Sequence, residues 1–494
     1  MNQSHPTLQN LAARLVAAAL LVNTLAAEMA WQHPHADEAN SSFARINTPT
    51  GSHALGVEIG PLAAGANPVF AADGTGYVGT TDGSLRAFKP DGTPMWTRTL
   101  RPEHGSIMAA PVVGADGSIY AVSTIFREDL KCHQSFFHKF TPGGGWVVAQ
   151  EFPRGTSDLP DRGATNAPLN MWRSNGVESI MVPVRYNRFG IEIIELLAFS
   201  TDGFLMGRQE LSAESPTTTS IPDSEWVLPC YALLWWIGGA PCFIGMVLTG
   251  GFAFSGPPGV VPMVGAGFPM AGVAIMPDTR GGAPLVFATD RKHALAVLSF
   301  SPQSGFTLLR KSDHPRFQFT TTPAAMPDGT AVIGTLEGRL FRMDRDLVET
   351  GSVNGVGMMT ASPTRLKDGT LLVLTRDGEM VHIGGSAVIG RMRPMSANGG
   401  GESIVSAAAS CTRVYVHTTT GLYTFDADTL KQLYVLEWRG GVYGPVIGPN
   451  GRVYGVSNKM LMVFDPPIVP PDVTGRTACD VVGKLPVGGV SSLK

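Results

Sequence analysis

Charged side chains are scarce in this chain of 494 residues: Asp, Glu, Lys and Arg make up 16% of it, against about 25% in a typical soluble domain. The net charge at pH 7 is only −3. A protein that binds nucleic acid carries an excess of positive charge to meet the phosphates. No nucleic-acid partner is therefore expected.

Cysteine is equally sparse, and no two cysteines are adjacent. The five cysteines are Cys132, Cys230, Cys242, Cys411 and Cys479. Because their number is odd, at least one cysteine stays without a disulfide partner within the chain, even in an oxidising compartment. The chain also lacks a phosphate-binding glycine loop, a Gly-x-Ser-x-Gly nucleophile elbow and a His-Glu-x-x-His zinc motif. These absences exclude several common enzyme classes.

Two small clusters contain residue types that ligate metals. One is His33, His35 and Asp37, and the other is Cys132, His133 and His138, within an insertion of the second repeat unit described below. Neither cluster has a second ligand pair at the spacing of a zinc site. We therefore predict no metal site and interpret these residues as surface or packed side chains.

Glycine and proline, in contrast, are abundant, with 59 and 37 copies. One glycine or proline inside a helix destabilises it by roughly 1 to 3 kcal/mol. The high content of both residues therefore excludes a helical bundle and favours short strands joined by many turns. Apolar residues make up 44% of the chain, which argues against disorder.

The turns recur at a period of about forty residues. Asp-Gly or Asn-Gly pairs separate short alternating runs, as in hairpins, and they begin at Asp73, Asp116, Asp328, Asp368 and Asn450. In three of these units a second turn follows nine residues later, at Asp82, Glu337 and Asp377. A further unit has predicted strands at residues 413–417 and 421–425, and two degenerate units cover residues 167–210 and 272–309. The count is eight.

Units of this size cannot bury both sheet faces alone, so radial stacking is expected. We predict an all-β, eight-bladed β-propeller of four-stranded antiparallel blades over residues 28–467. The last unit runs after Phe464 into Pro466 and Pro467, which cannot continue a sheet. The alternating run at residues 54–59 is predicted to supply its missing strand and close the ring.

Residues 1–27 are predicted to be a signal peptide, because Arg14 precedes an apolar stretch and the small residues Ala26 and Ala27. An uncleaved anchor is the alternative, although 11 to 13 apolar residues fall short of the roughly 20 that span a bilayer. The expected location is periplasmic or secreted. Residues 468–494 are predicted to form an extension, whose Cys479 pairs with Cys411 or stays free.

An apolar insertion is predicted at residues 226–271, and residues 227–277 contain no charged side chain. It contains Trp235 and Trp236 and would expose a large apolar surface in water. Three interpretations stay open: a lid over the channel mouth, a docking surface for a partner protein or membrane interface, and a membrane span. Cys230 and Cys242 could form a disulfide within it.

The run Gly-x-Gly-Tyr-Val-Gly-Thr-x-Asp-Gly-x-Leu-x-Ala-Phe at residues 74–88, with Trp96 after it, resembles the repeat of the quinoprotein-like β-propellers. The lead-in at residues 31–40 is also similar. The resemblance implies either a quinone-dependent alcohol dehydrogenase or a relative of the propeller subunit that serves outer-membrane protein assembly. The first would imply pyrroloquinoline quinone with Ca²⁺, a catalytic Asp, a Glu and an Asn on the metal, and an adjacent cysteine pair.

The chain departs from the dehydrogenase pattern. It has no Cys-Cys pair, and beyond Trp96 only Trp146 and Trp438 lie loosely at the equivalent positions. No stretch matches the metal-ligand motifs. We therefore place it closer to the non-catalytic propellers and predict no cofactor.

In a propeller, the loops between strands two and three and those from strand four to the next blade open on one face. Charged residues predicted on that face form a candidate binding surface, with solvated turn residues as the alternative: Asp82, Arg188, Arg291, Lys292, Arg376 and Lys459. The predicted function is an exported, monomeric binding or scaffolding module for protein or ligand partners. The alternative is a quinone-dependent dehydrogenase that oxidises alcohols or sugars with an atypical metal site.

Overall fold

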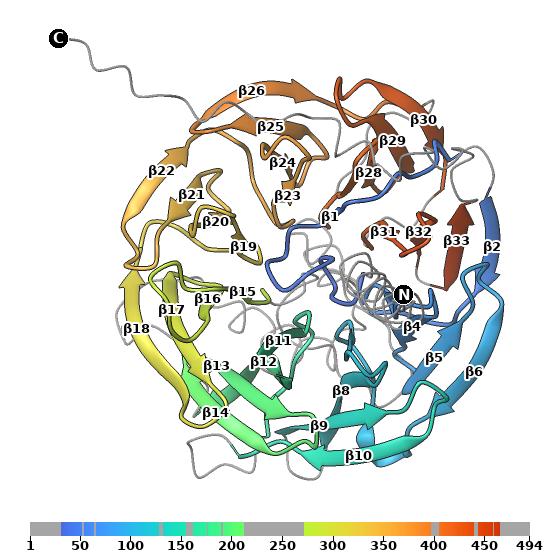
Figure 1. The fold of residues 1–494 in the computed structure, drawn as a ribbon, viewed down its shortest axis with the longest axis vertical. Helices are drawn as coiled ribbons and strands as arrows, with labels where there is room; N and C mark the ends of the chain where they lie inside the picture. Colours follow the sequence, from blue (N-terminus) through green and yellow to red (C-terminus); the bar gives the residue numbers. More distant parts are fainter. Residues whose placement is uncertain are drawn as a thin grey trace, which may run out of the picture.

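A computed structural model describes residues 31–464, except 52–53, 64–65, 128–131, 155–161, 175, 189–190, 212–270, 397–404, 439–442 and 458. Eight sheets stand around a central axis in chain order (Figure 1). Within the described residues the helical structure is one short 3-10 turn, η1 (Pro102–His104). The all-β, eight-bladed propeller predicted from the repeats is confirmed. The predicted signal peptide, most of the insertion and the C-terminal extension lie outside the described residues.

The blades in the first half of the chain each have four strands. Blade 1 contains β3 (Val69–Phe70), β4 (Gly76–Gly79), β5 (Ser84–Phe88) and β6 (Pro94–Thr99). Blade 2 contains β7 (Val112–Val113), β8 (Ile119–Arg127), β9 (Cys132–Phe140) and β10 (Trp146–Glu151). Blade 3 contains β11 (Asn170–Ser174), β12 (Val177–Arg188), β13 (Ile191–Ser200) and β14 (Leu205–Glu210). Blade 4 contains β15 (Ala274–Met276), β16 (Leu285–Thr289), β17 (Ala294–Ser301) and β18 (Gly305–Asp313).

The second half repeats the pattern. Blade 5 contains β19 (Ala324–Ala325), β20 (Ala331–Gly334), β21 (Leu340–Met343) and β22 (Glu349–Val353). Blade 6 contains β23 (Thr364–Arg365), β24 (Leu371–Leu374), β25 (Met380–Gly384) and β26 (Ala387–Met392). Blade 7 contains β27 (Ala408–Ser410), β28 (Arg413–His417), β29 (Leu422–Asp426) and β30 (Gln432–Leu436). Blade 8 contains β31 (Val446–Ile447), β32 (Val453–Val456) and β33 (Met460–Phe464).

The core is a ring of apolar layers between neighbouring blades rather than one central cluster. Most second strands are buried along their whole length, as in β4 (GYVG) and β24 (LLVL), because a blade packs on both of its faces. The outermost strands are mostly exposed, as in β6. Phe70 of blade 1 and Tyr454 of blade 8 pack together with ring centroids 4.5 Å apart, which joins the two ends of the ring.

The Asp-Gly turns lie where the repeat predicts them. In the hairpin between β4 and β5, Gly83 has a φ of 78°, a conformation that residues with a Cβ adopt rarely. A Cβ added there would lie 2.7 Å from the backbone oxygen of Gly105. Backbone conformation and close packing therefore both require glycine.

An N-terminal strand closes the ring, as predicted. Strand β2 (Ala54–Glu58) pairs antiparallel with β33 and becomes the outermost strand of blade 8, with Ala54 opposite Phe464 and Glu58 opposite Met460. Blade 8 thereby gains the fourth strand that the prolines after Phe464 prevent the C-terminal end from forming.

Two local features differ from the sequence prediction. Blade 7 has five strands, because β1 (Phe43–Ala44) pairs parallel with its innermost strand β27. Two residues of strand carry no detectable alternation, so the sequence does not reveal β1. The second cysteine-histidine cluster does not lie in an insertion: Cys132, His133 and His138 belong to β9, a regular strand of blade 2.

Candidate functional site

The loops between the second and third strands and the connections between blades open on one side of the ring, here called the connection face. The backbone N–H of Ile107, in the connection after blade 1, donates to the oxygen of Thr80 in the β4–β5 hairpin at 3.1 Å. The N–H of Met359, after blade 5, donates in the same way to Thr335 of the β20–β21 hairpin at 3.3 Å. The two kinds of loop therefore form one surface, as expected.

The charged residues of the candidate binding surface lie on five different blades of this face. Asp82, Lys292 and Lys459 are exposed, and the Asp82 carboxylate forms an ion pair with Arg86 at 3.1 Å. Arg376 directs its guanidinium to the sulfur of Met358 at 3.8 Å. Arg291 and Lys292 are neighbours in the hairpin between β16 and β17, and Arg188 ends β12.

The structure does not gather these charges at one point. None of them lines the hollow on the propeller axis described below. Trp235, Trp236, Cys230 and Cys242 lie outside the described residues. The charged set is a distributed rim, not a compact site.

Residues 31–46, here called the strap, run around the inside of the ring before β2 begins (Figure 1). Six strap carbonyls accept hydrogen bonds from the innermost strands of blades 1, 2, 4, 5, 6 and 7, in chain order. The backbone donors are Phe70 to Trp31, Val113 to Gln32, Ile275 to Glu38, Ala325 to Ala39, Arg365 to Ser41 and Ala409 to Ser42, at 2.8 to 3.1 Å. The strap thereby follows the ring from blade 1 to blade 7 and satisfies backbone donors that face the channel.

Buried amides fix the strap between these points. Asn170 of β11 bonds through Oδ1 to Nδ1 of His33 at 2.8 Å, and its Nδ2 donates to the oxygen of Glu38 at 2.9 Å and to that of Val273 at 2.6 Å. Asn40 donates to the oxygens of Val273 and Pro323. The strap is therefore joined to blades 3, 4 and 5 by side chains as well as by backbone.

Burial keeps the strap histidines neutral. It lowers the pKa of His33 to about 4, with the Arg173 charge adding to the effect, and lowers that of His35 to about 4. Burial also raises the pKa of Asp37, against the hydrogen bonds that its carboxylate accepts from Ser41. The histidines of the first predicted cluster are thus packed inside the ring.

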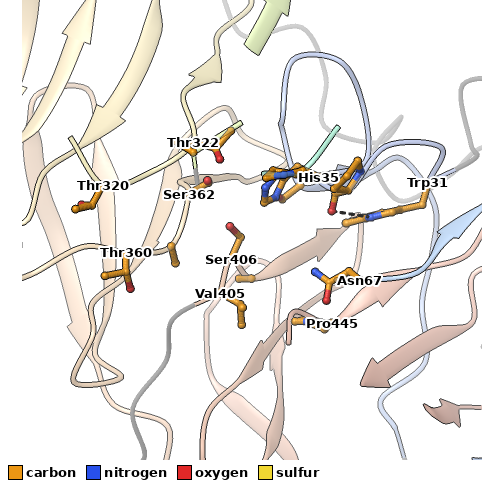
Figure 2. Close-up of a pocket in the computed structure, with 16 residues that line it drawn as sticks. Trp31, His35, Asn67, Thr320, Thr322, Thr360, Ser362, Val405, Ser406 and Pro445 are labelled. Carbon is orange, nitrogen blue, oxygen red and sulfur yellow. Dashed lines mark hydrogen bonds between the residues drawn. The ribbon is translucent and has the colours of Figure 1, made fainter. Parts of the chain in front are cut away.

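A hollow that is open to solvent lies on the propeller axis between the strap and the connections; we call it the axial pocket. Its polar lining consists of His35, Ser42, Asn67, Thr320, Thr322, Thr360, Ser362 and Ser406. Its other lining residues are Trp31, Pro34, Pro168, Ala271, Ala361, Val405, Ala407 and Pro445. Figure 2 shows these groups approaching from several blades.

Four of the eight polar lining residues come from one repeated position. Two residues before the innermost strand, blades 5, 6, 7 and 1 carry Thr322, Ser362, Ser406 and Asn67; at the same position blades 2, 3, 4 and 8 carry Ala110, Pro168, Gly272 and Gly444. The pocket consequently has a polar arc over blades 5, 6, 7 and 1, interrupted at blade 8, whereas blade 3 contributes Pro168. No described lining residue is charged at neutral pH, since His35 is neutral there.

Several polar groups of the pocket have unused hydrogen-bonding capacity. The hydroxyls of Thr360 and Ser406 are buried and have no partner among the described residues. Asn67 accepts through Oδ1 from the N–H of Gly444 at 3.0 Å, which leaves its Nδ2 to face the pocket. In Figure 2 the hydroxyls of Ser362 and Ser406 point toward the same space.

The described lining does not fit a quinone with Ca²⁺. Pyrroloquinoline quinone carries carboxylates, and a Ca²⁺ site is built from oxygen ligands that include carboxylates. Neither a cation for the first nor an acidic ligand for the second is among the described pocket residues. Elsewhere in the described ranges, no three His, Cys, Asp or Glu side chains lie close enough to share a metal ion.

Within those ranges, too, no helix has the length and apolarity to cross a bilayer.

The fold defines the chain as an eight-bladed β-propeller, and comparison with solved structures agrees. BamB from Moraxella catarrhalis superposes with a TM-score of 0.52 at 10% identity, over 84% of this chain and 99% of that one. Quinohemoprotein alcohol dehydrogenase ADHIIG from Pseudomonas putida HK5 gives 0.54 at 10% identity, over 91% and 83%. The C-terminal WD40 domain of Sif2 gives 0.51 at 9% identity, over 85% and 99%.

The resemblance to quinoprotein-like propellers is thus confirmed for the fold, in both the catalytic and the non-catalytic branch. At these identities the likeness concerns the fold alone. No protein-family profile and no curated protein sequence matches the chain.

The axial pocket was not predicted from the sequence, although a signal for part of it exists. The run Thr-Thr-Thr-Pro at residues 320–323 recurs as Thr-Ala-Ser-Pro forty residues later, at residues 360–363. Both runs directly precede a predicted inner strand. A search of the repeat for hydroxyl residues just before each inner strand would have found them.

Proposed function

We propose that this chain is an exported propeller that works as a binding or scaffolding module for a protein partner, without a quinone cofactor. One observation carries the proposal: the strap lies inside the ring, and the described residues of the axial pocket offer neither a cation nor a carboxylate. A dehydrogenase of the quinone-dependent kind needs both at its centre. A scaffold needs only a rigid ring with accessible loops.

Two features support export. The predicted signal peptide at residues 1–27 is one. The second is Cys411, which is disulfide-bonded in the hairpin between β27 and β28. Structural disulfides persist in oxidising compartments such as the periplasm or the extracellular space. Of the other cysteines, Cys132 is described and is not in a disulfide, so the partner of Cys411 lies outside the described residues.

The connection face is the proposed docking surface. Its rim carries Asp82, Lys292 and Lys459 in exposed positions. The predicted uncharged insertion at residues 226–271 belongs to the connection between Leu211 and Gly272, which opens on this same face, and Ala271 lines the axial pocket. Apolar stretches of this size within a polar rim mark protein or membrane contacts.

The test replaces residues 226–270 with a short Gly-Ser linker, which keeps Ala271 at the pocket. Crosslinking in the extracytoplasmic fraction, followed by mass spectrometry, compares partners of the wild type and the variant. We expect the variant to keep the circular dichroism and melting temperature of the ring and to lose its crosslinked partner. Unchanged crosslinks would contradict docking through the insertion, and flotation with anionic and neutral vesicles separates a membrane from a protein partner.

The catalytic alternative has its own test. Pyrroloquinoline quinone and CaCl₂ are added to the purified chain, and dye reduction with alcohols and sugars is followed together with the visible absorption spectrum. The proposal expects neither dye reduction nor a bound chromophore. Either signal would favour the dehydrogenase and would place its ligands in the stretches outside the described residues.

A further inference from the structure

We infer that the axial pocket is a binding site for a neutral, polyhydroxylated small molecule of the saccharide class. This inference goes beyond the proposed scaffolding function, because it concerns the channel rather than the outer loops. It does not depend on the insertion.

The first step is the absence of charge in the described lining. A ligand with a carboxylate, phosphate or ammonium group would bury a charge without a partner there, which is strongly unfavourable. His35, the one titratable lining residue, is kept neutral by its burial. The described pocket thus selects against charged ligands.

The second step is the chemistry of the free groups. A hydroxyl donates one hydrogen bond and accepts others, and an amide offers both roles. Ser406 is only 8% exposed, lines the pocket and has no hydrogen-bond partner for its hydroxyl among the described residues. The hydroxyl of Thr360, which also lines the pocket, is likewise buried and has no hydrogen-bond partner among the described residues. A buried polar group without a partner is unfavourable, and a ligand hydroxyl would satisfy each of these two.

The third step is the arrangement. Thr322, Ser362, Ser406 and Asn67 repeat one position in four blades and form an arc, and Ala361, Val405, Ala407 and Pro445 lie between or beside them. A saccharide presents the same alternation, with hydroxyls at the edge of the ring and C–H groups on its faces. Hydroxyl and amide side chains, each able to donate and accept hydrogen bonds, alternate here with apolar side chains. This arrangement fits a saccharide better than a purely apolar ligand.

The fourth step concerns rigidity. The floor of the pocket is the strap, in which Trp31 donates to the oxygen of Pro34 at 3.3 Å and is 3% exposed. The walls are short segments that lead directly into inner strands of the ring. Such a site is held in place before the ligand arrives, and preorganisation of this kind favours binding.

The experiment measures binding of defined probes to the full chain by isothermal titration calorimetry and by saturation-transfer NMR. The neutral probes are methyl α-glucoside, maltose and myo-inositol. Glucuronate and glucosamine are the charged counterparts. We expect saturable binding of at least one neutral probe and none of the charged ones.

Two substitutions test the location, Ser406→Ala and Thr360→Val, with Thr97→Val on the exposed strand β6 as the matched control. Each pocket variant is expected to weaken binding about fivefold, the effect of one neutral hydrogen bond, whereas the control leaves it unchanged. Melting temperatures confirm that the variants are folded.

Three outcomes would overturn the inference. The first is no saturable binding of any neutral probe up to about 50 mM, well above the millimolar range of weak ligands. The second is equal binding of glucuronate or glucosamine. The third is binding that neither pocket substitution weakens. The deletion of residues 226–270 leaves the polar arc in place, so loss of the protein partner and loss of saccharide binding are separate results.

Discussion

At the scale of single residues, Asn170 connects three parts of the molecule, and the sequence around it does not indicate this role. It is 2% exposed. Its Oδ1 accepts from the N–H of Met171 at 2.8 Å and bonds to His33, while its Nδ2 donates to the strap and to blade 4. One side chain therefore joins two blades and the strap.

The substitution Asn170→Ala is expected to lower the free energy of unfolding by about 2 to 4 kcal/mol. It removes the partner of the buried His33 imidazole and of the Met171 N–H. It also takes one of two donors from the oxygens of Glu38 and Val273. Urea unfolding followed by tryptophan fluorescence measures the change. Asn354→Ala, at an exposed position, is the matched control and should change stability by less than about 0.5 kcal/mol. A loss at position 170 no larger than in the control would show that the strap does not depend on this residue.

The axial pocket illustrates what residue patterns can and cannot predict. The Asp-Gly turns are visible because φ above zero restricts the residue type. A serine such as Ser406 has no such restriction, since a hydroxyl fits a surface, a turn or a pocket. Its position in the pocket follows only from the ring geometry, which brings equivalent positions of different blades together.

At the scale of elements, the strap is the feature that distinguishes this ring from a simple array of blades. Six backbone N–H groups of inner strands donate to its carbonyls, and β1 extends blade 7 on the channel side. An innermost strand otherwise leaves its edge donors facing the channel. The strap satisfies these donors and links blades that are not neighbours in sequence.

Removal of residues 31–46, with β2 retained, is expected to destabilise the ring by several kcal/mol, because each lost hydrogen bond contributes about 0.5 to 1.5 kcal/mol. Calorimetric melting measures the effect, and hydrogen exchange should show faster exchange at Ile275, Ala325 and Arg365. A chain shortened at residue 480, which keeps Cys479, is the control. Unchanged exchange at these three amides would mean that the strap does not protect the channel edge.

The sequence predicts regular elements well and the strap poorly, for a physical reason. Strands such as β4 and β24 alternate between turn residues at fixed spacing, and β2 was predicted from its alternation and from the prolines that end blade 8. The strap contacts six of the blades through backbone carbonyls, which every residue type possesses. Its side-chain pattern therefore does not predict which strands these carbonyls bond.

At the scale of the whole molecule, pairings between distant parts of the chain hold the ring together. The β2–β33 and β1–β27 pairs are two of these junctions. The disulfide of Cys411 is another. Strand β33 ends on the side of the ring opposite the connection face, where the hairpin that contains Cys411 also lies. This favours Cys479 over Cys230 and Cys242 as its partner.

Peptide mapping without reduction is expected to recover a peptide pair joined through Cys411 and Cys479. Cys479→Ser should then destabilise the chain by about 2 to 4 kcal/mol, the usual effect of a disulfide that closes a long loop, and the loss should vanish when wild type and variant are compared under reducing conditions. A linkage from Cys411 to Cys230 or Cys242 would refute the assignment and would also exclude the predicted pair within the insertion.

The acid stability of the ring depends on its buried histidines, of which His138 in blade 2 is the clearest case. It is fully buried, bonds through Nε2 to the hydroxyl of Ser123 at 2.7 Å, and has no partner for Nδ1 among the described residues. Burial lowers its pKa to about 3, and the neighbouring His104 adds to this effect. The unfolded chain therefore binds a proton here below about pH 6.5, and the folded ring does not.

The contribution of His138 to the free energy of unfolding is consequently at its maximum above about pH 6.5 and falls as the pH decreases toward 3. Between pH 7.5 and pH 5 this group alone lowers the free energy of unfolding by about 2 kcal/mol. His138→Phe preserves the aromatic packing against Phe140 and Trp146 and removes the titration. The variant loses the bond to Ser123 at every pH, so its stability relative to wild type should be lowest at pH 7.5 and should improve by about 2 kcal/mol at pH 5. Urea unfolding at both pH values measures this double difference. If it is independent of pH, His138 is not neutral by burial, and the acid sensitivity of the ring arises from other groups.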